Sequence, residues 1–187
     1  MEKISPVDEE REKKLSSLGY LKGADLSKIK QKDPDEAMVV LAKLEKARSE
    51  YLFGDLNIAL NLYNELLEEF PSSSVILDER GLILYSLGKK EEARKSFELS
   101  LKYFPGNFNA LINLANYYSQ EGKLKEAIAY YEKASALKPQ DPDLLFNYAA
   151  TCANSGEMKK AKELFKKYLK LYPDDPEKAK IEEFLKK

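Results

Sequence analysis

The feature that most constrains this 187-residue chain is a repeat, because the same residue types return every 34 residues. Gly54, Gly88, Gly122 and Gly156 mark the period. Each glycine is followed by an alanine after five residues, an aromatic residue after nine and a proline after seventeen, and a small residue lies seven positions before it. A fixed period of this length predicts one supersecondary unit that stacks on copies of itself. The residues of these columns are Ala59, Ala93, Ala127 and Ala161; Tyr63, Phe97, Tyr131 and Phe165; Pro71, Pro105, Pro139 and Pro173; and Ala47, Gly81, Ala115 and Ala149.

Each column has a mechanical interpretation. The segment before a glycine has helical spacing, as in Leu111, Leu114 and Tyr118. Glycine then ends this helix, because it adopts the left-handed cap without a steric penalty. A second apolar stripe follows, with Leu124 and Ile128 as examples, and proline ends the unit. The pattern predicts helix pairs whose small residues allow close approach and whose aromatic residues fill the gap between pairs.

The pattern resembles the tetratricopeptide repeat, a helix–turn–helix unit of 34 residues. The resemblance implies an all-α, right-handed α-solenoid of four repeats, followed by a C-terminal capping helix. At the family's usual tryptophan position this chain has Lys43, Leu77, Leu111 and Leu145. Leucine is a common variant there and lysine is not, so the first helix is expected to bury a different face. That face is traced through Val40, Leu44, Ala47 and Tyr51.

The same spacing predicts the domain organisation. We expect a partly ordered arm at 1–33 with a short helix around 8–17, four repeats within 34–175, and a capping helix at 176–187. Asp33 followed by Pro34 favours a first helix at 34–53. The capping helix should place Ile181 and either Phe184 or Leu185 against the fourth repeat. The four repeats are expected at 40–73, 74–107, 108–141 and 142–175.

In this family the first helix of each pair lines a concave groove. Excluding the core stripe leaves the candidate residues of a peptide-binding groove, and Asn113 and Asn147 take equivalent places among them. A primary amide both donates and accepts, so two of them could hold a peptide backbone, as in the asparagine ladders of some family members. The alternative is that these asparagines have a local structural role. The candidate groove residues are Asn109, Ile112, Asn113, Asn116, Gln120, Asp143, Phe146, Asn147 and Asn154.

One repeat earlier the corresponding face is acidic and apolar, with Asp78 and Glu79 on it. Some family members grip a C-terminal carboxylate with lysine, asparagine and arginine from three repeats. Matching that pattern from the first or the second repeat finds no lysine and places an acidic residue in the site. A carboxylate clamp is therefore not expected.

The composition argues against several functions. Histidine is absent and Cys152 is the only cysteine, which removes the commonest general base, the usual zinc ligand and any internal disulfide. We therefore expect no enzyme, no cofactor and no metal. The net charge of −1 gives no basic stripe for nucleic acid. The pairs Tyr117–Tyr118 and Tyr130–Tyr131 could stack on nucleic-acid bases or on sugars, but we interpret Tyr118 and Tyr131 as core residues, and Cys152 as a buried small hydrophobe.

These observations predict a scaffold or adaptor that binds another protein or peptide, whose identity the sequence does not give. An alternative comes from the string LSSLGYLKG, because residues 15–34 resemble the C-terminal tail of arylsulfatase-like proteins that carry these repeats. That resemblance implies an appendage that recruits or oligomerises a larger hydrolase and holds none of its catalytic residues. A third hypothesis is self-association through the open ends of the solenoid, which would give a homo-oligomer.

The sequence has no run of 18 or more apolar residues, so we expect no membrane insertion. Its first residues, MEKISPVDEE, lack the pattern of a secretory signal. The expectation is a soluble protein that is cytoplasmic by default, or extracytoplasmic if the chain is a fragment of a sulfatase-like protein.

Overall fold

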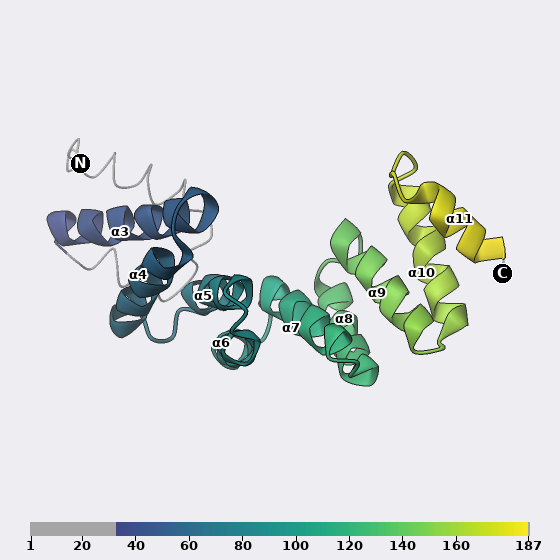
Figure 1. Ribbon diagram of the computed structural model, residues 1–187, viewed down its shortest axis with the longest axis horizontal. Coiled ribbons are helices and arrows are strands. Elements are labelled where there is room, and N and C mark those ends of the chain that lie inside the picture. Colours follow the sequence, from purple (N-terminus) through teal and green to yellow (C-terminus); the bar gives the residue numbers. More distant parts are fainter. Residues whose placement is uncertain (1–32, 187) are drawn as a thin grey trace, which may run out of the picture. The chain divides into compact units, whose positions relative to one another are not determined.

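The computed structural model describes residues 33–186, and all regular secondary structure in that range is α-helical (Figure 1). The all-α class predicted from the sequence is confirmed for these residues. The arm expected at 1–33, its short helix and the string at 15–23 lie outside them, except for Asp33. The chain divides into two units between Pro105 and Gly106.

Consecutive helices pack against each other within each unit (Figure 1). The helices of unit 1 are α3 (Pro34–Phe53), α4 (Leu56–Glu69), α5 (Ser74–Ser86) and α6 (Lys90–Tyr103). The helices of unit 2 are α7 (Phe108–Gln120), α8 (Leu124–Leu137), α9 (Pro142–Asn154), α10 (Met158–Leu171) and α11 (Lys178–Lys186).

Three of the four marker glycines end a helix in the way that the sequence predicts. Gly88, Gly122 and Gly156 have φ angles of 76°, 73° and 85°, in the left-handed region. At the first of them, Lys89 N–H donates to Leu84 O and Gly88 N–H donates to Tyr85 O, both at 2.9 Å. This pair of bonds is the Schellman motif, and it satisfies two carbonyls that the helix end would leave unpaired.

The prediction is wrong at Gly54, whose φ is −127°. Helix α3 continues to the residue directly before this glycine, and side chains close the turn instead. Glu50 Oε2 accepts from Asp55 N–H at 3.1 Å, and Asp55 Oδ1 accepts from Asn57 N–H at 2.7 Å, which caps α4. A Cβ on Gly54 would overlap Glu50 Oε2, so a larger residue here would displace the carboxylate that closes the turn, and no left-handed conformation is involved.

Helix α3 occupies Pro34–Phe53, as predicted from the Asp33–Pro34 pair, and Asp33 Oδ1 accepts from Asp35 N–H at 3.0 Å. The expectation that this helix buries a different face is confirmed. Lys43, at the position of the family tryptophan, lies at the edge of that face and pairs with Glu65 at 2.8 Å. The buried residues of α3 are Ala37, Val40, Leu41, Leu44 and Ala47, and Tyr51 is half-buried.

The small and aromatic columns form the framework of both units. Every alanine five residues after a marker glycine is 0% exposed, and the four aromatic residues are at most 7% exposed. In unit 1 the two columns fit each other directly, because a Cβ on Gly81 would overlap the ring of Phe97. Burying one such aromatic side chain contributes about 1.5–3 kcal/mol.

Helix α11 covers the last pair of unit 2. Ile181 is 3% exposed and joins a buried cluster with Leu145, Phe165 and Tyr168. The Phe184 ring packs on Phe165 with centroids 5.3 Å apart, and Leu185 also contacts the cluster. Both of the residues that the sequence offered as alternatives therefore pack against α9 and α10.

Candidate functional site

The candidate site lies on helices α7 and α9 of unit 2. Each helix buries one face in the core, and the two helices contact each other, with Ser119 Oγ and Thr151 Oγ1 3.0 Å apart. Their remaining faces carry all nine of the predicted groove residues; we call these faces together the amide face. The buried residues of the core faces are Ala110, Leu111, Leu114, Ala115 and Tyr117 in α7, and Leu144, Leu145, Tyr148, Ala149, Thr151 and Cys152 in α9.

The five residues on α7 differ in what they contact. Asn109 and Gln120, at the two ends of the helix, are exposed, whereas Ile112 and Asn113 are half-buried. Asn116 has an internal role, because its Oδ1 accepts a hydrogen bond from Tyr131 OH at 2.5 Å. Asn116 therefore positions the buried tyrosine of α8, and no sequence pattern predicts this bond.

The four residues on α9 also divide into two kinds. Asp143 and Asn154 are exposed at the two ends of the helix. Phe146 is half-buried and packs edge-on against Phe165 and Tyr168, with centroid distances of 5.8 and 5.7 Å, so it extends the core near α11. Asn147 is half-buried, and its side chain makes no hydrogen bond within the described part of the chain.

Charge is unevenly distributed among the helices of unit 2. The two 13-residue helices α7 and α9 carry one charged side chain, that of Asp143. The two 14-residue helices α8 and α10 carry four and seven charged side chains. The amide face is therefore neutral except at the start of α9.

Three lysines of unit 2 that lie near its core contact a carboxylate or an aromatic ring. Lys160 Nζ pairs with Glu132 at 2.5 Å and lies 5.0 Å from the centre of the Tyr148 ring. The bond from Lys160 is the main cause that lowers the pKa of Glu132. Lys138 and Lys133 lie over aromatic rings in the same way, 4.2 Å from Phe108 and 5.3 Å from Tyr130.

The tyrosines of unit 2 serve packing. Tyr131 is 1% exposed, and burial raises its pKa to about 12. It stacks on Tyr148 at 5.5 Å, and Tyr118 stacks on Tyr130 at the same distance. The expectation that Tyr118 is a core residue is only partly met, because Tyr118 is half-buried while its neighbour Tyr117 is 5% exposed.

Cys152 is 0% exposed, and burial raises the pKa of its thiol to about 11. It is the small buried hydrophobe that its place on the stripe predicts.

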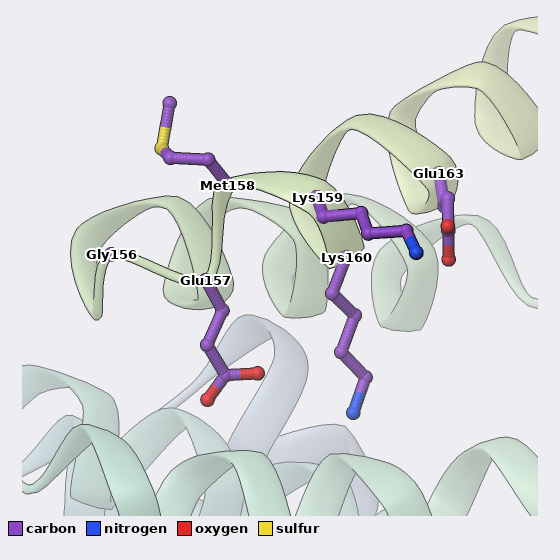
Figure 2. Close-up of a pocket in the computed structure, with 6 residues that line it drawn as sticks. All are labelled: Gly156, Glu157, Met158, Lys159, Lys160 and Glu163. Atoms are coloured by element: carbon purple, nitrogen blue, oxygen red, sulfur yellow. The ribbon is translucent and has the colours of Figure 1, made fainter.

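A shallow depression lies at the turn between α9 and α10 (Figure 2). The side chains of Glu157 and Lys160 extend to one side of this turn and that of Met158 to the other (Figure 2). None of the predicted groove residues lines it, and Lys160 is already paired with Glu132. Its lining residues are Gly156, Glu157, Met158, Lys159, Lys160 and Glu163.

The equivalent face of unit 1 is closed by internal bonds. The Arg48 guanidinium pairs with Glu79, and Tyr63 OH donates to the other oxygen of the same carboxylate at 2.8 Å. Asp78 is 4% exposed. The one arginine at a position that could match a carboxylate clamp is thus neutralised within the protein.

Among residues 33–186 no three histidine, cysteine, aspartate or glutamate side chains group as metal ligands. No helix in the same range is long and apolar enough to cross a membrane.

Stacked helix pairs with a small–aromatic framework define a helical-repeat protein. Sequence patterns of the tetratricopeptide repeat match residues 44–108, 79–142 and 118–181. The chain belongs to the tetratricopeptide repeat family, and each of its two units has the consecutive packed helix pairs of that fold. Domains of this family typically bind proteins or peptides and are generally non-catalytic scaffolds.

Solved structures with the same fold include MamA from Desulfovibrio magneticus RS-1, with a TM-score of 0.67 and 20% identity over 73% of this chain and 77% of that chain. A second is the first such domain of Spaghetti (RPAP3) bound to the HSP90 peptide SRMEEVD, with a TM-score of 0.57 and 21% identity over 60% of this chain and 90% of that chain. At these identities the likeness concerns the fold alone. No curated protein matches the sequence.

Proposed function

We propose that this protein is a scaffold or adaptor, and that the amide face of unit 2 binds an extended segment of another protein. The observation that carries the proposal is Asn147, a half-buried amide whose side chain makes no hydrogen bond within residues 33–186. Asn113 takes the same place one repeat earlier, on the helix that contacts α9.

The chemistry of a primary amide suits this role. Its oxygen accepts and its NH2 group donates, so one side chain can pair with both polar groups of a peptide unit. An amide binds backbone groups that every sequence presents, so it gives affinity with little side-chain selection. Ile112 and Phe146, half-buried beside the two asparagines, can add apolar contacts.

The interaction can be tested with peptides selected from a displayed random library on the intact protein. Dissociation constants are then measured for the wild type, for the double variant Asn113→Ala/Asn147→Ala, and for a matched control in unit 1, Asn57→Ala/Asn61→Ala, on the exposed side of α4. Losing two hydrogen bonds of about 1 kcal/mol each should weaken binding roughly tenfold or more. The control should bind like the wild type.

Circular dichroism and urea unfolding establish that both double variants keep the native helix content. A folded Asn113→Ala/Asn147→Ala variant with unchanged affinity would contradict the proposal, as would a library that yields no binder. A mass that rises with protein concentration in light scattering, with no peptide bound, would favour self-association instead.

A further inference from the structure

The charges around the amide face indicate the class of segment that it accepts, and this inference rests on the proposed function. We infer that the bound segment is internal to its protein, uncharged over most of its length, and basic where it passes the start of α9 at Asp143. Acidic segments and free C-terminal carboxylates are excluded.

The basic preference follows from the surroundings of Asp143. This carboxylate is exposed in the first turn of α9 and has no ion-pair partner within residues 33–186. A second carboxylate is that of Asp175, whose Oδ2 accepts from Tyr168 OH at 2.6 Å. Burial is the largest cause that raises the pKa of Tyr168 to about 12. The hydrogen bond to Asp175 is the next cause, and the charge of Asp143 makes a smaller contribution. The exposed Asp143 carboxylate is therefore the one unpaired charge of α7 and α9, and it gives the start of α9 a negative potential.

The exclusion of acidic segments follows from the missing cations. Neither α7 nor α9 contains a lysine or an arginine. Lys160 is paired with Glu132, and Lys138 lies over the Phe108 ring. A carboxylate brought onto the amide face would lose hydration and meet no lysine or arginine of α7 or α9, which is unfavourable.

A structural role for Asp143 must be separated from a role in binding, because an acidic residue in a first turn also stabilises its helix. The chain offers a matched control. Asp33–Pro34–Asp35 starts α3 in unit 1 with the same three residues as Asp141–Pro142–Asp143 at α9. Asp35→Asn therefore removes the same helix-stabilising charge far along the chain from the amide face.

The test uses one neutral peptide from the library, acetylated and amidated, with Lys, Gln or Glu placed in turn at each position. At the position nearest Asp143 the wild type should bind the Lys peptide about twofold to fivefold more tightly than the Gln peptide, as expected for one exposed ion pair. The Glu peptide should bind more weakly than the Gln peptide at every position. High salt should reduce the Lys preference and leave the affinity of the Gln peptide unchanged.

Asp143→Asn should abolish the Lys preference, and Asp35→Asn should keep it. The inference is overturned if Asp143→Asn keeps the Lys preference, if Glu peptides bind as tightly as Gln peptides, or if a free C-terminus improves binding. These failures differ from failure of the proposed function. If only the charge preference fails, Asn113→Ala/Asn147→Ala still weakens the binding of every peptide. If the proposed function fails, that double variant weakens the binding of none.

Discussion

Tyr63 in unit 1 and Tyr131 in unit 2 occupy the same column of the repeat, and both are at most 1% exposed. Their hydroxyl groups meet different partners, since Tyr63 donates to the charged Glu79 and Tyr131 to the neutral Asn116. Burial raises the pKa of both phenols, and the adjacent Glu79 charge raises that of Tyr63 further. The two units thus share a buried framework. They differ in the polar side chains that the first helix of each pair places next to it, which are charged in unit 1 and neutral in unit 2.

This difference distinguishes the positions whose residue type is restricted by packing from the positions that can vary. The alanine and aromatic columns are fixed, because each side chain fills a space that its neighbours define. The residues around them vary: they include an ion pair between Arg48 and Glu79 in unit 1, and uncharged amides on α7 and α9 in unit 2. Binding is therefore expected where the face is neutral over most of its length, which is unit 2.

The largest expected effect tests whether the framework is equivalent in the two units. Phe97→Ala in unit 1 and Tyr131→Ala in unit 2 each remove a buried ring and should each lower the free energy of unfolding by about 3–5 kcal/mol. Urea unfolding followed by circular dichroism measures both. A loss below about 1 kcal/mol in only one of them would break the equivalence.

The next effect concerns alkaline pH. The folded-state pKa of Tyr131 is raised from 10 to about 12, so its contribution to stability is complete below pH 10 and is lost between pH 10 and pH 12. The loss should reach about 1.4 kcal/mol per pH unit for this one group. Tyr131→Phe should make the decline in unfolding free energy shallower across that window. An identical slope in the variant would show that the phenol does not contribute.

The small column gives a sharper test within unit 1. Gly81→Ala places a methyl group against the Phe97 ring and should destabilise the protein by about 1–3 kcal/mol, as overpacking does. At Gly88, where a Cβ would meet no atom, Gly88→Ala should cost about 1 kcal/mol, because only the left-handed backbone opposes it. Thermal and urea unfolding rank the two. The opposite order would contradict the close fit of Gly81 and Phe97.

The smallest effect concerns helix starts. Asp141 Oδ1 accepts from Leu144 N–H at 3.0 Å, so Asp141→Ala should cost about 1 kcal/mol. Lys89, which starts α6 without a side-chain cap, provides the control. Lys89→Ala should leave the unfolding midpoint unchanged, and equal losses would remove the distinction between capped and uncapped starts.

The framework was predictable from the sequence because close packing restricts residue type at fixed spacing. The Gly54 turn was not, since its closure depends on the carboxylates of Glu50 and Asp55, which the period of the repeat does not report. The internal bond of Asn116 was missed for a related reason. Its place on the helix suggests the amide face, and only the position of Tyr131 OH shows that it points to the core side.

The most direct test of the amide face is nuclear magnetic resonance of the side-chain NH2 groups during titration with the neutral selected peptide. We predict that the signals of Asn113 and Asn147 shift in proportion to occupancy, while those of Asn57 and Asn61 on α4 stay in place. Shifts confined to the depression at 156–163, or to α4, with Asn113 and Asn147 unchanged, would contradict the account.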